Sequence, residues 1–221
     1  MDRTLGSWTI YGAACSGSVP IEAALTLVQI PYSVIEAITW ADAAAQERVA
    51  PVNPLRQVPT VILPGGEVMT ESAAILIHLA DSQPGSGLAP PVYDPARAQF
   101  LRWMNYVSAA IYSLHWILVD PQRIGVAPTL HAPVTRALGE RIAACWQFMD
   151  AQLEPGTYLL GEDLSVLDLY VAVVSRFGPC WRRNFYGAAP RMAKVVRRVD
   201  AEPRLAAFWA RRYPFEDGWE G

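Results

Sequence analysis

This sequence has little cysteine, little histidine and little charge. Of its 221 residues, three are cysteine and three are histidine, and 18% are charged. The cysteines, Cys15, Cys145 and Cys180, are odd in number and far apart. They therefore indicate free thiols in a reducing compartment and not a disulfide framework. Neither the histidines nor the cysteines have the spacing of metal ligands, so we predict no metal site.

The sequence also lacks a long hydrophobic run and an excess of positive charge. Its first residues do not have a basic region followed by an apolar core, so we expect no signal peptide. A membrane-spanning helix needs about 20 apolar residues, whereas Asp120, Asp163 and Asp168 interrupt the longest apolar stretches here. The net charge of −3 argues against general nucleic-acid binding. We expect a cytoplasmic protein that binds neither membranes nor nucleic acid. Its 52% hydrophobic content is ample for a core of one or two domains.

The first 82 residues have the pattern of a compact α/β unit. Short apolar or alternating segments predict strands, and apolar residues at three- and four-residue spacing predict helices. The expected strands are 8–11, 32–38, 60–63 and 67–69, and the expected helices are 19–29, 41–50 and 73–79. This order resembles the plan of thioredoxin, so we predict a thioredoxin-like domain over residues 1–82.

The rest of the chain has a helical pattern. Turn-forming residues are frequent over 83–95, which we interpret as a linker. The expected helices of the following domain, 96–221, are 95–118, 134–153, 169–174, 190–199 and 203–212. Ser165 and Asp168 have the spacing of a helix capping box, to which we assign a role in folding. The predicted fold class is α/β plus all-α, with a helical-bundle domain after the thioredoxin-like one.

One corner of the first domain has the residues that a small zwitterionic peptide needs. Pro59 fits the first position of a strand and holds Val58 in an extended conformation. If the Val58–Pro59 peptide bond is cis, the backbone N–H and C=O of Val58 point outward. Ser72 lies where a helix begins, and the N–H groups there attract a carboxylate. Glu71 beside it offers a site for an ammonium group. The corner therefore offers a backbone edge, an anion site and a cation site.

This arrangement resembles the glutathione site of the glutathione S-transferases. The residues that carry the resemblance are Asn53, Pro54, Gln57, Val58, Pro59, Thr60, Glu71, Ser72 and Ile75. The resemblance implies that glutathione is a co-substrate. It further implies that Gln57 reaches the glycine end of glutathione, that Val58 bonds the cysteinyl backbone, and that Glu71 and Ser72 hold the γ-glutamyl end.

The loop before the first helix contains the candidate catalytic residues. A transferase must hold the glutathione sulfur as a thiolate, and a free thiol has a pKa of about 8.5, so a donor at a helix N-terminus is needed. Cys15 and Ser16 are placed for this, and Tyr11 is a third candidate. Ala14, Cys15 and Ser16 look like the Ala-Cys-Ser segment of the beta class, in which the cysteine lies beside the glutathione sulfur and can form a mixed disulfide with it. The loop also resembles the Ser-Ser-Cys motif of the zeta class, but Ala13 and Ala14 replace both serines.

Three roles for Cys15 stay open: a hydrogen-bond donor in conjugation, a nucleophile in thiol–disulfide exchange, or an inert apolar side chain. The segment 103–106 resembles one of the beta class whose asparagine reaches glutathione in the neighbouring subunit. The resemblance therefore implies a role for Asn105 and a homodimer. Tyr112 stands where the beta class has a histidine near the sulfur, so we expect it to line a pocket for a small hydrophobic electrophile.

We therefore predict a glutathione transferase-like detoxification enzyme that attacks an electrophilic small molecule or a disulfide with glutathione thiolate. Two alternatives stay open. One is a glutathione-dependent isomerase or lyase, and the other is a non-catalytic binding or scaffold protein with the transferase fold. Retention of Val58, Pro59, Glu71 and Ser72 favours glutathione binding, and Ala13 and Ala14 argue the other way.

Overall fold

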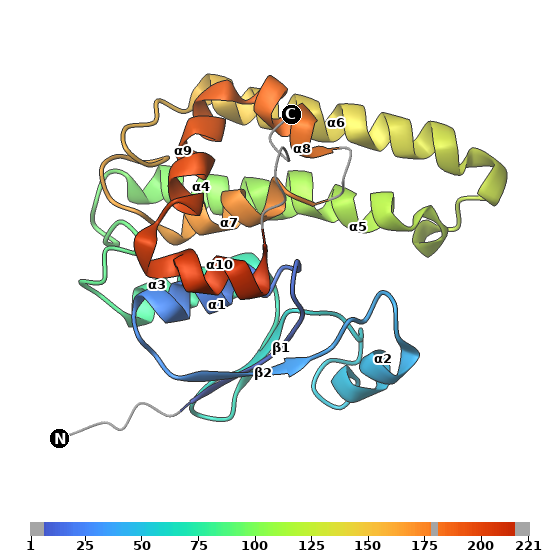
Figure 1. The fold of residues 1–221 in the computed structure, drawn as a ribbon, viewed down its shortest axis with the longest axis horizontal. Coiled ribbons are helices and arrows are strands. Elements are labelled where there is room, and N and C mark those ends of the chain that lie inside the picture. Colours follow the sequence, from blue (N-terminus) through green and yellow to red (C-terminus); the bar gives the residue numbers. More distant parts are fainter. Residues whose placement is uncertain (1–6, 178–180, 215–221) are drawn as a thin grey trace. The chain divides into compact units, whose positions relative to one another are not determined.

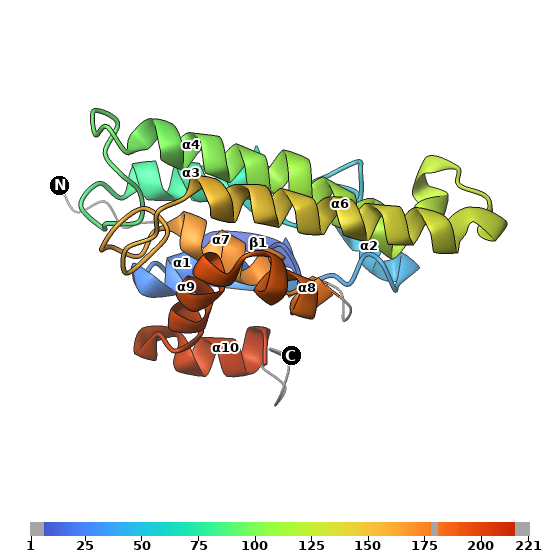
Figure 2. The ribbon, with the colours of Figure 1, turned by 90° about the horizontal axis from the view of Figure 1, so that it is seen from above.

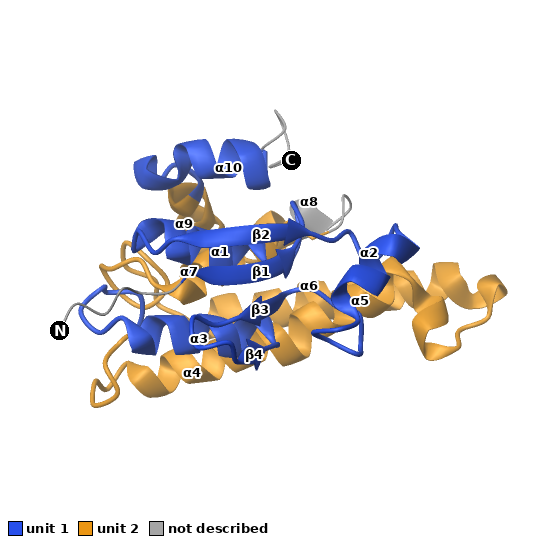
Figure 3. Cartoon of the chain, turned by 90° about the horizontal axis from the view of Figure 1, so that it is seen from below, with its two compact units in different colours: residues 1–89, 200–215 blue, residues 90–199, 216–221 orange. Residues whose placement is uncertain are grey.

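A computed structural model describes residues 7–177 and 181–214 of this chain, with the side chains of 181–184 left aside. The chain divides into two compact units (Figure 3). Unit 1 contains residues 1–89 and 200–215, and unit 2 contains residues 90–199 and 216–221. The predicted first domain ended at residue 82 and did not include the C-terminal segment 200–215. Cys180 lies outside the described residues.

Unit 1 is built on a four-stranded sheet, and each of its predicted strands is confirmed. The strands are β1 (Trp8–Gly12), β2 (Tyr32–Glu36), β3 (Thr60–Ile62) and β4 (Val68–Met69), in the order β2-β1-β3-β4. β1 pairs with β2 in parallel, whereas β3 is antiparallel to both β1 and β4. The parallel pair needs a crossover connection, which α1 provides.

Three helices of unit 1 lie where the sequence predicts them: α1 (Val19–Leu27), α2 (Ala43–Val49) and α3 (Ser72–Ser82) (Figure 1). α1 packs against α3. Alternate β1 residues Trp8 and Ile10 are buried, as period-2 alternation requires. Tyr11 packs against a different cluster, around Ala45 and Val49 of α2. Its ring is therefore part of the packing around α2.

Unit 1 also contains the C-terminal elements η4 (Pro203–Leu205) and α10 (Ala206–Arg212), both of which contact α1. The sequence predicted this helical segment correctly but assigned it to the helical domain. Buried Leu205, Phe208 and Trp209 explain its position, because these large apolar side chains need a core to pack against.

Unit 2 is helical, as predicted. Its helices are α4 (Arg97–Tyr106), η1 (Val107–Tyr112), α5 (Ser113–Val119), η2 (Pro121–Ile124), η3 (Pro128–Leu130), α6 (His131–Gln152), α7 (Val166–Val174), α8 (Trp181–Ala188) and α9 (Pro190–Asp200). The predicted helix over 95–118 is continuous, but its middle turn η1 is π-helical. α6 packs against this long helix (Figure 2). We did not predict α8 or the two short 3-10 turns.

The capping box before α7 is confirmed. The Asp168 carboxylate accepts the backbone N–H of Ser165 at 2.8 Å and its hydroxyl at 2.7 Å. The same carboxylate accepts the Leu159 N–H at 2.8 Å, so it ties the preceding loop to the helix. Burial raises the pKa of Asp168 to about 6, although these hydrogen bonds oppose the shift.

Candidate active site

Strand pairing brings three segments of unit 1 to one end of the sheet. The end of β1 lies beside the start of β3, because Tyr11 pairs with Thr60. The start of β3 in turn lies beside the end of β4, because Val61 pairs with Met69. The loop after β1, the residues just before β3 and the residues just after β4 therefore share this end. These three segments carry Cys15 and Ser16, then Gln57 to Pro59, then Glu71 and Ser72.

The turn before β3 is held from inside, and it leaves Val58 available. The Val58–Pro59 peptide bond is cis. Buried Asn53 donates its side-chain amide to the Gln57 carbonyl at 3.2 Å and to the Thr60 hydroxyl at 3.1 Å. The Thr60 hydroxyl donates to the same Gln57 carbonyl at 2.9 Å. Within the described part of the chain, no hydrogen bond uses the backbone N–H or C=O of Val58.

The turn into α3 places a carboxylate beside a helix N-terminus. Glu71 is exposed and has a φ of 66°, which a non-glycine residue seldom adopts, while its carbonyl accepts the Ile75 N–H at 2.9 Å. Strained backbone of this kind is found at ligand sites. Among the described residues, none forms a hydrogen bond or an ion pair with the Glu71 carboxylate. Ser72 is the buried first residue of the helix. An ammonium and a carboxylate group of one ligand can be bound side by side here.

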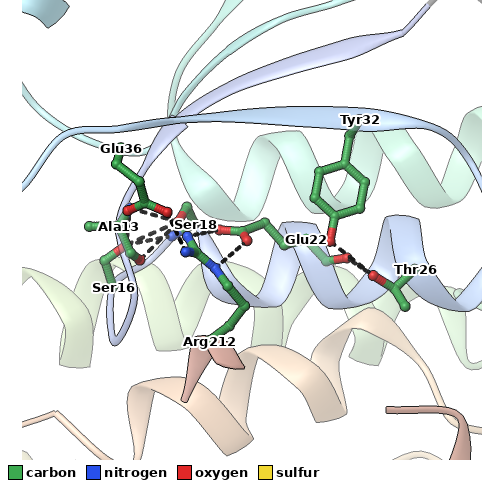
Figure 4. Close-up of polar contacts among 8 residues, drawn as sticks. All are labelled: Ala13, Ser16, Ser18, Glu22, Thr26, Tyr32, Glu36 and Arg212. Atoms are coloured by element: carbon green, nitrogen blue, oxygen red, sulfur yellow. Dashed lines mark hydrogen bonds and ion pairs between the residues drawn. The ribbon is translucent and has the colours of Figure 1, made fainter. Parts of the chain in front are cut away.

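The two candidate catalytic side chains differ in their surroundings. The Ser16 hydroxyl is buried and donates to the Ala13 carbonyl at 2.7 Å (Figure 4). It also accepts the N–H groups of Ala13 and Ser18. Its proton therefore holds the loop together and does not point to a ligand. Cys15 is exposed and has a φ of 57°, and its N–H donates to the carbonyl of Arg212 at 3.0 Å.

A set of donors that the sequence reasoning missed lies between Cys15 and α1. Among the residues described, no hydrogen bond uses the backbone N–H groups of Ser16 or Gly17, which precede the helix. Such N–H groups before a helix favour an anion. They can stabilise a thiolate near Cys15 without any contribution from the Ser16 hydroxyl.

The sequence reasoning also missed Glu22 and Arg212. Glu22 has 0% exposed side chain and forms an ion pair with Arg212 at 2.6 Å. The Ser18 hydroxyl donates to Glu22 at 2.7 Å, which joins the pair to the loop after β1. The available signal was a single acid inside the apolar helix 19–27, because an acid in a buried helix face needs a partner.

The two remaining candidates lie in unit 2. Asn105 is exposed on α4, and its side-chain amide donates to the Leu101 carbonyl of its own helix at 2.8 Å. Tyr112 ends the π-helical turn and lies 5.0 Å from Phe177 between ring centroids. π-Helical turns occur frequently at functional sites.

His115 lies one turn after Tyr112 but is only 3% exposed. Neither of its ring nitrogens has a hydrogen-bond partner among the described residues, and burial lowers its pKa to about 4. The imidazole is therefore neutral and belongs to the core.

In residues 7–177 and 181–214, no three His, Cys, Asp or Glu side chains gather in a way that could hold a metal ion. No helix in the same part of the chain has the length and apolar character of a membrane span.

Comparisons with known proteins fit this geometry. Residues 14–82 match the model of the glutathione S-transferase N-terminal domain. The chain is 32% identical over 197 residues to the uncharacterized GST-like protein YncG of Escherichia coli strain K12, covering 89% of this chain and 94% of that protein. It is 28% identical over 159 residues to glutathione S-transferase GstA of Escherichia coli O157:H7, covering 71% of this chain and 76% of GstA. A solved structure of a glutathione transferase homologue from Sulfitobacter, with bound glutathione, superimposes with a TM-score of 0.80 and 26% identity, covering 91% of this chain and 96% of that one.

Proposed function

The chain belongs to the glutathione S-transferase family, and we propose that it binds glutathione at the end of the sheet of unit 1 and uses its thiolate as a nucleophile. The observation that carries this proposal is the shared position of exposed Cys15, the free backbone groups of Val58 and the exposed carboxylate of Glu71. The relatives do not favour an isomerase, a lyase or a scaffold over a transferase.

In this proposal each part of glutathione has its own partner. The N–H and C=O of Val58, held by the turn that Pro59 ends, pair with the cysteinyl backbone as a short antiparallel strand would. Glu71 binds the ammonium group of the γ-glutamyl end, and Ser72 with the start of α3 binds its carboxylate. Exposed Gln57 reaches the glycine end.

The glutathione sulfur then lies near Cys15. The backbone N–H groups of Ser16 and Gly17 lower the thiol pKa by favouring the anion. Attack on an electrophilic carbon forms a carbon–sulfur bond and expels the leaving group with its electron pair. With a disulfide substrate, the attacking thiolate forms a new disulfide and releases the other sulfur as a thiolate. Exposure of Cys15 favours the nucleophile and donor roles over that of an inert filler. Ser16 orders the loop.

The remaining expectations belong to the same proposal. A homodimer would allow Asn105 to reach glutathione in the partner subunit, and its exposure fits that role. Tyr112, beside Phe177, lines the site of a small hydrophobic electrophile. The protein works in the cytoplasm in detoxification, without a metal.

Calorimetric titration of glutathione tests the site. Replacing Glu71 by glutamine removes a charge-assisted hydrogen bond worth about 1.5–3 kcal/mol, so Kd should rise about 10- to 100-fold. The matched control is Glu67→Gln, which makes the same charge change at another exposed position four residues earlier. We expect the control to keep the wild-type Kd within about twofold.

Cys15→Ala separates binding from chemistry. We expect it to keep glutathione binding and to lose disulfide reduction. A ligand that binds the folded state must stabilise it. If titration of glutathione into the wild-type protein releases no heat, and millimolar glutathione does not raise the melting temperature, the proposal is refuted.

A further inference from the structure

The C-terminal helix α10 is joined to the loop that carries Cys15 by both the backbone and the side chain of Arg212. The Arg212 carbonyl, at the end of α10, accepts the N–H of Cys15 at 3.0 Å. The Arg212 guanidinium pairs with Glu22 on α1 through Nε at 2.6 Å and Nη2 at 3.0 Å. Its Nη1 donates to Glu36 at the end of β2 (Figure 4). One residue thus connects α10, α1 and β2 with the loop.

The side-chain connection continues into the loop. Glu22 accepts the Ser18 hydroxyl at 2.7 Å, and the Ser18 and Ser16 hydroxyls lie 3.0 Å apart. The Ser16 hydroxyl closes the chain on the Ala13 carbonyl at 2.7 Å. The residues on both sides of Cys15 are therefore held by hydrogen bonds that lead back to Arg212. Cys15 itself is held at its N–H in the left-handed region, with a φ of 57°.

The contacts with Glu22 and Glu36 require both the positive charge and the planar guanidinium of Arg212. The Glu22 side chain is 0% exposed and that of Arg212 is 15% exposed, so each desolvated charge depends on the other. Burial alone would lower the pKa of Arg212, but hydrogen bonds and ion pairs with Glu22 and Glu36 raise it above its ordinary value. The planar guanidinium donates one hydrogen bond to Glu22 and one to Glu36 while its Nε forms an ion pair with Glu22, whereas a lysine ammonium is a single point charge.

We propose that Arg212 is a positioning residue for Cys15, so that the last helix of the chain sets the geometry and reactivity of the thiol. This inference rests on the proposed function in one respect, namely that Cys15 acts in the reaction. In this role Arg212 does not touch the substrate. It fixes the loop in which the free N–H groups of Ser16 and Gly17 precede α1, and those groups favour the Cys15 thiolate.

The test compares Arg212→Lys with Arg211→Lys. Arg211 is the neighbouring arginine on α10 and is exposed, and its side chain forms no hydrogen bond or ion pair with the described residues, so it is a matched control. The first readout is the alkylation rate of Cys15 by iodoacetamide at pH 7, followed by mass spectrometry of the peptide that contains Cys15. We expect alkylation to slow by about threefold or more in Arg212→Lys, because the thiolate fraction falls, and to stay unchanged in the control.

The second readout is the split between kcat and KM in glutathione-dependent reduction of a small disulfide. A displaced reacting group costs about 10- to 100-fold in rate. We expect such a fall in kcat for Arg212→Lys, with KM for glutathione within about twofold, because the residues before β3 and after β4 are untouched. Arg211→Lys should match the wild type in both constants.

The outcomes are separable. If Arg212→Lys is folded by circular dichroism and keeps wild-type alkylation and kcat, the proposal is overturned, even if its melting temperature has dropped. If Arg212→Lys does not fold, the pair Glu22→Gln with Arg212→Gln, which removes both buried charges together, must show the same two losses. Alkylation needs no glutathione, so its result stands even if the proposed glutathione site proves wrong.

Discussion

Replacing Asn53 by alanine tests how the turn before the cis peptide bond presents Val58. The Asn53 side chain is 6% exposed and makes three hydrogen bonds within its own turn. It donates to the Gln57 carbonyl at 3.2 Å and to the Thr60 hydroxyl at 3.1 Å, and it accepts the Leu55 N–H at 3.0 Å. No atom of this side chain is expected to touch glutathione, so any loss of binding must act through the backbone of Val58.

The size of the effect follows from the partners that remain. After the change, the Gln57 carbonyl still accepts the Thr60 hydroxyl at 2.9 Å, and Leu55 is 73% exposed, so water can satisfy its N–H. The loss is therefore that of one buried and one partly buried hydrogen bond, each worth about 0.5–1.5 kcal/mol net, or about 1–3 kcal/mol together. For a chain of this size, 1 kcal/mol shifts the melting temperature by about 2–4 °C. We expect a decrease of about 2–12 °C and, because the turn loses its fixed shape, a glutathione Kd raised about 10-fold.

Thermal unfolding followed by circular dichroism and calorimetric titration measure the two effects. Leu55→Ala is the control, because its exposed side chain lies in the same turn and should change neither quantity. An Asn53→Ala protein that melts within about 1 °C of the wild type and binds glutathione equally well would refute the reasoning. A loss of stability with unchanged binding would mean that the turn does not govern the presentation of Val58.

Three further predictions concern stability. Ser165→Ala, which removes one hydroxyl from the capping box, should cost about 1 kcal/mol and lower the melting temperature by about 2–4 °C. In Gly12→Ala the new Cβ would lie 2.3 Å from the Ser18 hydroxyl oxygen, and relieving that clash should cost about 1–3 kcal/mol, measured by urea unfolding. The pKa of His115 is lowered from 6.5 to about 4, so the unfolded chain binds more protons between these values. Above about pH 6.5 His115 therefore does not lower the free energy of unfolding. As the pH falls from 6.5 towards 4, this free energy decreases by about 3 kcal/mol at most. His115→Phe should make the free energy of unfolding depend less on pH between 4 and 6.5. A variant with the same pH dependence as the wild type would contradict the conclusion that His115 is buried and neutral.

The features that the sequence predicted correctly are local. The strand 60–63 and the helix 73–79 could be assigned from alternation and from helical spacing, because these patterns reflect one buried face of an isolated element. The capping box at Ser165 and Asp168 was predictable for the same reason, since its hydrogen bonds close within four residues. The corner with Val58, Pro59, Glu71 and Ser72 could be singled out as a candidate site because these residues have fixed spacing around one hairpin.

The sequence could not decide which of two adjacent side chains was available in the loop after β1. Cys15 and Ser16 were competing candidates, because both residue types can donate to a thiolate. The structure shows that the Ser16 proton is used by the Ala13 carbonyl and that Cys15 is exposed. Hydrogen-bond partners depend on how the loop turns, and a positive φ at Cys15 has no signature in a residue that is not glycine.

The position of the C-terminal helix was decided by tertiary structure alone. The sequence determined that residues 203–212 are helical, and it placed a lone acid, Glu22, within an apolar helix. It did not indicate that Arg212 meets that acid, 190 residues away. An arginine near the end of an amphipathic helix is usually solvated, and no periodic pattern marks the one that is buried. Only the packing of α10 on α1 excludes water from both charges, and this exclusion makes their pairing specific.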